Sequence, residues 1–325
     1  MRKSEYPKIS IVTPSYNQGR YIEQTIQSVL DQQYPNLEFI IIDGGSTDEA
    51  PQIIKKYEKH LKYWVSEKDQ GQSDAINKGL LHCTGKVFNW LNSDDLLVSD
   101  SLTQIGESFM DDGIDILTGK EIHFGIGQED LKYGSIIFSE LEMNLVSGVI
   151  YQPSTFWRMD VLKRLLPLHE TLHYLMDTDL WIRYVLAYGT KGIKKIEAPL
   201  AKFRVHPEAK STLYQDDFDR ERWLLRNTIF EKLDLFPKEW LDFSIAAVGD
   251  LDGYGRLKIH KEVNDRIFQR LFAEEMTYSL YIRNEYSRLR KFLFSAIEQG
   301  VFSRKLMKYL LRMSIPLPLL KRLRD

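Results

Sequence analysis

Two hydrophobic periods alternate along the first hundred residues. Short apolar runs rich in β-branched residues, such as "ISIVTP" and "LEFIIID", are typical of strands. Between them, "YIEQTIQSVLDQ" places Ile22, Ile26 and Val29 on one helical face. The run "LEFIIID" is almost continuously apolar, as expected of a strand covered on both sides. The pattern therefore predicts a β-α-β-α-β-α-β series, with a parallel sheet between two layers of helices.

The boundaries of these elements follow from the same pattern. We expect strands at 9–14, 37–43, 63–66, 86–91, 114–119 and 200–206, and helices at 21–32, 48–61, 73–82, 101–110 and 177–189. The helix from residue 48 has Asp48 or Thr47 as its cap and Pro51 in its first turn. The uncharged stretch Leu145 to Trp157 is interpreted as a buried strand.

The character of the chain changes near residue 214. Strand signals end there, and the following sequence is helical and rich in charge. We therefore expect an α/β part over residues 1–213 and a helical region over 214–325.

Composition narrows the function classes. The 325 residues are 43% hydrophobic and 28% charged, with a formal net charge of −2. These values are typical of a soluble globular protein, and the balanced charge gives no reason to expect a nucleic-acid partner. The single cysteine, Cys83, fits a reducing compartment. We find neither a signal peptide nor an apolar run of about 20 residues, so we expect a cytoplasmic protein.

Three polar motifs follow predicted strands, at the edge of a parallel sheet where ligands bind. In "TPSYN", Tyr16 could stack on a base, and in "DGGSTD", Asp43 could accept hydrogen bonds from a base or ribose. In "NSDD", Asp94 and Asp95 stand side by side, so something must offset their repulsion. This motif is either an ordinary polar turn or a Mg²⁺ or Mn²⁺ site bridged to a substrate diphosphate.

The chain resembles the family 2 glycosyltransferases, which have the GT-A fold. The resemblance rests on five motifs in order, "TPSYN", "IIDGGSTD", "GQSDAINKG", "WLNSDD" and "MDTDLWIR", and covers about residues 7 to 206. It implies an α/β GT-A fold with a mostly parallel central sheet. It also implies a nucleotide-sugar donor, a divalent cation and inversion at the anomeric carbon. Residues 1–98 would then form the donor half and residues 99–213 the acceptor half.

The resemblance also implies roles for individual residues. Pro14, Tyr16 and Asp43 would line the base and ribose, and Asp94 would lie toward the ribose or metal. Asp95 would bind the metal. Further donor contacts would come from Asn17, Gly45, Ser46, Gln72, Ser73 and Asn77, and His206 would lie near the diphosphate or metal.

Two departures from the family pattern concern the donor site. Many relatives have "DDGS" where this chain has Gly44, and "ARN" where it has Ala75, Ile76 and Asn77. The missing arginine leaves the diphosphate contact open, with Lys68 or Gln72 as possible substitutes.

Asp177 in "MDTDLWIR" matches the acidic position that serves as the general base in the family. Inverting transfer needs a carboxylate that removes the proton of the attacking hydroxyl. Asp179 is two residues further on, which is about 200° around a helix, so both carboxylates cannot serve one site. Asp179 is instead expected to be a cap or a partner of Arg183, four residues later.

Two other functions are compatible with parts of the sequence. "HETLH" matches H-E-x-x-H, so His169 and His173 on a helix could hold zinc with Glu170 as the base of a peptidase. Two features argue against this function. Pro167 leaves room for at most one helical turn before the motif, and the candidate third ligand, Glu197, lies near a predicted short strand. A nucleotide-sugar-binding module without turnover is the other alternative, although the acidic motifs are retained.

The tail from residue 303 combines leucines with seven basic residues. Such a basic amphipathic helix either packs on the rest of the protein or lies on an anionic membrane surface. We expect the acceptor to be a growing or lipid-linked glycan, as in polysaccharide biosynthesis for a cell envelope. A lipid-linked acceptor would favour peripheral contact with the inner face of the cell membrane.

Overall fold

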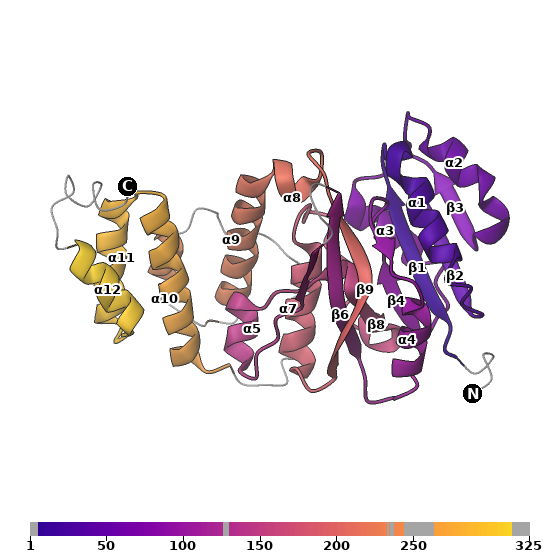
Figure 1. Cartoon of the computed structure of the whole chain (residues 1–325). Helices are drawn as coiled ribbons and strands as arrows, with labels where there is room; N and C mark the ends of the chain where they lie inside the picture. The colour runs from indigo at the N-terminus through magenta and orange to yellow at the C-terminus, as the bar shows by residue number, and fades with distance from the viewer. Residues whose placement is uncertain (1–5, 126–129, 233, 235–236, 244–262, 314–325) are drawn as a thin grey trace.

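A computed structural model describes residues 6–125, 130–232, 234, 237–243 and 263–313. Its centre is one mixed sheet, seen at the right of Figure 1, with spatial order β3-β2-β1-β4-β8-β6-β9-β5 and β7 beside β6. The four strands at one side are parallel: β1 (Ile9–Ser15), β2 (Leu37–Asp43), β3 (Tyr63–Ser66) and β4 (Val87–Trp90). The rest of the sheet comprises β5 (Leu96–Leu97), β6 (Ile116–Gly125), β7 (Asp130–Gly134), β8 (Thr155–Arg158) and β9 (Ile193–Val205). The expected α/β fold is confirmed.

Apolar residues alternate between the two faces of the parallel strands. Ile11 and Ile41 belong to a hydrophobic cluster with α1 (Gly19–Leu30), α2 (Ala50–Lys56) and α4 (Ser101–Ser108). Val12, Ile40 and Ile42 belong to a second cluster with α3 (Gln72–Leu80), α5 (Leu141–Ser147) and α7 (Met176–Tyr188). Both faces are therefore covered, which explains why β2 is apolar at nearly every position.

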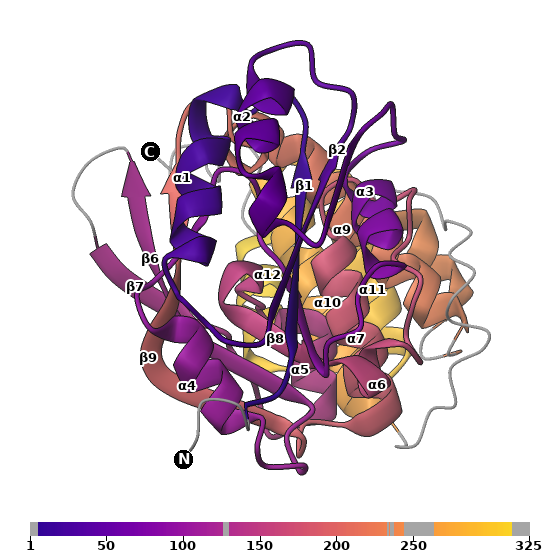
Figure 2. The same cartoon turned by 90° about the vertical axis from the view of Figure 1, so that its right-hand side faces the viewer.

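The second cluster continues into the helices that follow the sheet. These are α9 (Gln215–Lys232), α10 (Asp265–Ile282), α11 (Tyr286–Glu298) and α12 (Arg304–Met313), after the short α6 (Met159–Leu162) and α8 (Lys210–Leu213). The long helices α9 to α12 extend away from the sheet in Figure 1 and lie behind it in Figure 2. Among the described helices, none has the length and apolar character that crossing a membrane requires.

The interpretation of Leu145 to Trp157 as one strand is wrong. α5 reaches Ser147, and a 3-10 turn, η3 (Gln152–Ser154), precedes β8, so only the last three residues of the stretch belong to a strand. The Asn144 side chain donates to the carbonyls of Phe138 and Glu140 and so folds the segment before Gly148 into a compact turn and helix. Uncharged sequence indicated burial but not backbone geometry.

The helix expected over 48–61 is shorter in the structure. α2 ends at Lys56, and a 3-10 turn, η2 (Glu58–His60), follows it. Pro51 lies in the first turn of α2, as expected, and the Asp48 carboxylate accepts the backbone N–H of Ala50 at 3.0 Å.

Candidate active site

The ends of β1 and β2 carry two loops that are hydrogen-bonded to each other. The Asn17 backbone N–H donates to Ser46 Oγ at 2.7 Å, and Asn17 Oδ1 accepts the Thr47 N–H at 2.9 Å. Gly45 supports this turn with a φ of +78°, a region that glycine adopts without strain. The neighbouring Tyr16 side chain is 61% exposed, so its ring is accessible to a ligand.

Asp43 ends β2 between Ser15 of β1 and Ser66 of β3 in the sheet register. Its carboxylate is buried and accepts bonds from Ser46 N, Ser46 Oγ and Ser66 Oγ. In this arrangement Asp43 fixes the loop after β2, and any contact with a base would have to share these oxygens.

The acid pair lies against the end of β9. β5 pairs with β9, which brings Asp94 and Asp95, just before β5, next to residues 204–206. Asp94 Oδ2 is 3.1 Å from His206 Nε2. Asp95 is almost fully buried, and its Oδ1 accepts the backbone N–H of Arg204 at 2.9 Å. The two acids are therefore contacted by an imidazole and a backbone amide at the end of β9, more than 100 residues away in the sequence.

The electrostatics of this pair follow from burial. Burial raises the pKa of Asp95 well above its usual value, and the adjacent Asp94 carboxylate raises it further. Burial also raises the pKa of Glu121, on β6, to about 8, and its Oε1 is 2.7 Å from His123 Nε2. Ionising these buried carboxylates together is therefore unfavourable, and a cation bound beside them would reduce that cost.

The side chains present suit a hard divalent cation. Asp94 and His206 bring a carboxylate oxygen and an imidazole nitrogen together, and both are donors that Mn²⁺ accepts. Asp95 Oδ2 accepts only a long hydrogen bond of 3.2 Å from Asn92, so this oxygen could also bind a cation. Within the described residues, no group of three His, Cys, Asp or Glu side chains is arranged to enclose an ion.

A chain of hydrogen bonds joins the acid pair to the loop before α7. Gln72 Nε2 donates to Asn92 Oδ1 at 2.8 Å, and Asn92 in turn bonds to Asp95. Lys210 Nζ donates to Gln72 Oε1 at 3.0 Å and to the His173 carbonyl at 3.2 Å. An ammonium group therefore stands between the two acidic sites, and it is a third candidate, beside Lys68 and Gln72, for the missing arginine.

The side chains of Ser73 and Asn77, which we expected to contact the donor, bond to the segment 168–172. Ser73 Oγ donates to the Leu172 carbonyl at 3.2 Å. The Asn77 amide donates to the Leu168 carbonyl at 2.9 Å and accepts the Leu168 N–H at 3.0 Å. Because their polar atoms are used in these bonds, both residues hold the segment 168–172 that leads to α7.

Asp177 lies in the first turn of α7 and is partly buried. Its Oδ1 accepts the Thr178 backbone N–H at 2.6 Å. Burial raises the pKa of Asp177 to about 6 against the lowering effect of the Thr178 bonds, and Glu221 adds a small upward contribution. A carboxylate with this pKa is ionised at neutral pH and is a stronger base than an exposed aspartate.

Glu221 on α9 fixes the loop immediately before Asp177. Its buried carboxylate accepts the backbone N–H groups of His173, Tyr174 and Leu175 at 2.7, 2.7 and 2.5 Å. The helical region after residue 214 thus contributes directly to the geometry of the site.

Asp179 forms the partnership expected from its spacing. Its Oδ2 is 2.6 Å from Arg183 Nη2, and both side chains are buried. Arg183 also donates to the carbonyls of Leu165 and Pro167. The prediction of an ion pair four residues apart is confirmed, so Asp179 acts in the structure of α7 and its preceding loop.

Replacing Asp179 with Ala should lower the free energy of unfolding by about 3–5 kcal/mol, because Arg183 is left as an uncompensated buried charge. Urea denaturation followed by circular dichroism measures this change. Asp216→Ala, at an exposed position at the start of α9, is the control and should change stability by less than about 0.5 kcal/mol. Equal stability of the two variants would contradict the structural role of the pair.

The H-E-x-x-H match does not form a zinc site here. Residues 169–173 lie in a turn before α7, so His169 and His173 do not share a helical face. His169 lies 3.8 Å from Asp179, and Glu170 accepts a bond from Asn77. Glu197, the candidate third ligand, pairs with Lys120 at 2.7 Å on β9. The peptidase alternative is therefore wrong on geometry.

Comparisons with known proteins point to the glycosyltransferases. A model of the family described as "Glycosyl transferase family 2" matches residues 10–165. An uncharacterized glycosyltransferase of Nostoc sp. strain PCC 7120 is 29% identical over 213 residues, 61% of this chain and 65% of that protein. A candidate teichuronic acid biosynthesis glycosyltransferase, TuaG of Bacillus subtilis strain 168, is 41% identical over 110 residues, 32% of this chain and 43% of that protein. The matches span less than two thirds of both relatives.

Solved structures agree at the level of the fold. TarS of S. aureus, residues 1–349 in complex with UDP, has a TM-score of 0.54 at 19% identity, over 91% of this chain and 93% of that one. A mannosyltransferase of Pyrobaculum calidifontis in complex with GDP-Man and Mn²⁺ has a TM-score of 0.53 at 16% identity, over 95% and 80%. The fold is GT-A-like, and residues 10–165 match the model of glycosyltransferase family 2.

Proposed function

We propose that this protein is a metal-dependent, inverting glycosyltransferase that moves a sugar from a nucleotide diphosphate to a hydroxyl group of a glycan. The observation that carries the proposal is the hydrogen-bonded path from Asp95 through Asn92, Gln72 and Lys210 to the loop before Asp177. This path supports the proposal, because it links the acid pair proposed to hold the cation and diphosphate to the loop that precedes the proposed base.

Asp177 is the base in this proposal. The acceptor oxygen attacks the anomeric carbon from the face opposite the diphosphate, and its proton passes to the Asp177 carboxylate. A new C–O bond forms as the bond between the anomeric carbon and the diphosphate oxygen breaks. The nucleoside diphosphate leaves with the electron pair of that bond, so the sugar is transferred with inversion.

Asp94, Asp95 and His206 would hold the divalent cation, Mn²⁺ or Mg²⁺, together with oxygens of the donor. Such an ion would neutralise the negative charge that grows on the leaving diphosphate. Asp94 and His206 are the better placed, because Asp95 lies beneath them and is held by the Arg204 amide. Lys210 adds a second positive charge on the side of the site that faces Asp177.

The donor base and ribose would bind at the ends of β1 and β2. The exposed Tyr16 ring offers a stacking surface, while Pro14, Asn17, Gly45 and Ser46 shape the two loops around it. Asp43 and Asp94 would accept hydrogen bonds from an N–H group of the base and from the ribose hydroxyls. A uridine diphosphate sugar is the first donor to test, since the TarS crystals contain UDP or UDP-GlcNAc, with a guanosine diphosphate sugar second.

The acceptor in this proposal is a growing or lipid-linked glycan of the cell envelope. TuaG supports this choice, because its description places it in the synthesis of teichuronic acid.

A thermal-shift screen tests the function directly. Nucleoside diphosphates and their sugars, each with and without Mn²⁺, are added to the purified protein. A ligand that binds only the folded state at about 100 times its dissociation constant adds about 2.7 kcal/mol of stability. We expect one nucleotide class to raise the melting temperature with Mn²⁺, followed by slow release of free sugar. Binding without any release would support the non-catalytic module instead.

A further inference from the structure

One face of α12 is apolar and exposed. The helix buries Leu306, Tyr309 and Met313 against α10 and α11. Met307 is nevertheless 42% exposed and Leu311 is 67% exposed. At about 100° per residue, these two lie on a sector outside the buried one. The apolar arc of α12 is therefore wider than its contact with the protein requires.

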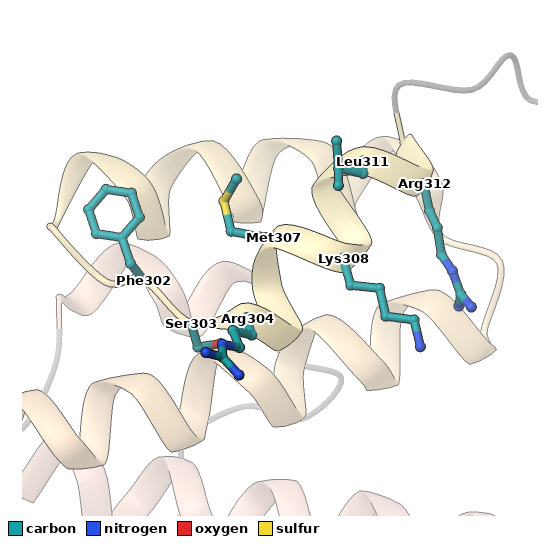
Figure 3. Close-up of a pocket in the computed structure, with 7 residues that line it drawn as sticks. All are labelled: Phe302, Ser303, Arg304, Met307, Lys308, Leu311 and Arg312. Carbon is teal, nitrogen blue, oxygen red and sulfur yellow. The ribbon is translucent and has the colours of Figure 1, made fainter.

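A row of cations borders this exposed apolar sector. Arg304, Lys308 and Arg312 are four residues apart and form a line along the helix next to Met307 and Leu311. Figure 3 shows the two apolar side chains rising from one side of α12 and Lys308 and Arg312 pointing from another. No acidic residue occurs in α12, whose sequence is RKLMKYLLRM.

Phe302 enlarges the apolar surface. It lies just before the helix, is 59% exposed, and lines a shallow surface hollow with the α12 side chains (Figure 3). The hollow is lined by Phe302, Ser303, Arg304, Met307, Lys308, Leu311 and Arg312. An aromatic ring and two long apolar side chains at one level, with cations beside them, are typical of a helix at a lipid–water interface.

We propose that this α12 face docks on the surface of an anionic lipid bilayer. Its apolar side chains would enter the boundary between headgroups and acyl chains, while the three cations would contact phosphate groups. A second copy of the chain fits less well, because a twofold contact would bring the same basic rows together. The sequence after residue 313, "SIPLPLLKRLRD", has the same leucine-rich and basic composition, although it lies outside the described residues. Docking would not depend on the proposed transfer reaction.

Vesicle flotation of the full chain tests the proposal. Vesicles of phosphatidylcholine alone are compared with vesicles that also contain phosphatidylglycerol. We expect flotation with the anionic vesicles only. Arg304→Gln/Lys308→Gln should weaken partitioning by about thirtyfold at low salt, and Met307→Ser/Leu311→Ser by about tenfold or more. Leu81→Ser is the control, because Leu81 is 84% exposed in the α3 region, away from α12, and should partition as the unchanged protein does.

Circular dichroism and melting temperature show whether each variant is folded, and only folded variants are compared. The proposal is overturned if the unchanged chain does not float with anionic vesicles, or if the α12 variants float as well as the control. A dimer in light scattering that Met307→Ser/Leu311→Ser dissociates, without flotation, would assign the face to a second copy.

Discussion

Asp177→Asn should reduce sugar transfer by about 10²–10⁴-fold, the range expected when a general base is removed. The amide has the same shape and can still accept the Thr178 N–H, so the fold and donor affinity should change little. Initial rates of nucleoside diphosphate release in the presence of acceptor measure the effect. Asp216→Asn, an exposed acid on α9, is the matched control and should transfer at the normal rate.

The pH dependence of transfer gives the same residue a second readout. The base must be ionised, and burial places the pKa of Asp177 at about 6. The rate constant kcat/KM should therefore fall as the pH drops through about 6 and stay level above it, until another group titrates. Two results would show that Asp177 is not the base. One is a near-normal rate in Asp177→Asn, and the other is a rate of the unchanged protein that does not vary between pH 5 and 8.

Asp94→Asn should reduce transfer by about a hundredfold or more, through loss of the cation rather than loss of the fold. The substitution removes the charge nearest His206 while keeping a side chain of the same size. The loss should be accompanied by a much weaker dependence of donor binding on Mn²⁺. Transfer at increasing Mn²⁺ concentration, with Asp31→Asn as an exposed control just after α1, measures both effects.

Asp94 is a better test position than its neighbour Asp95. Removing the Asp95 side chain would leave the Arg204 amide without its acceptor in a buried place, so activity and stability would change together. If Asp94→Asn keeps full Mn²⁺-dependent transfer, the cation does not bind at this acid pair.

The parts of the site that follow strands could be predicted from the sequence. Asp43 is the last residue of β2 and the Asp94–Asp95 pair follows β4 by a few residues, so local spacing is enough to place them at one edge of the sheet. The Asp179–Arg183 pair was likewise predictable, because four residues on a helix give a fixed geometry.

The residues that the sequence did not indicate come from distant segments. Lys210 and Glu221 act on the loop before Asp177 only because α8 and α9 fold back onto it, and no local period encodes that contact. Ser73 and Asn77 lie within a recognisable motif, yet their side chains face the segment 168–172. The motif marked the two residues as candidates for the site, whereas only the tertiary structure shows which groups they bond to.

The central claim is that the acid pair with His206 binds the cation and donor, while Asp177 performs the chemistry. Isothermal titration of the donor identified by the thermal-shift screen, with Mn²⁺, into three proteins tests it most directly. We expect the unchanged chain and Asp177→Asn to bind with similar affinity, and Asp94→Asn to bind at least tenfold more weakly. Equal binding by all three, or loss of binding in Asp177→Asn alone, would contradict this division of roles.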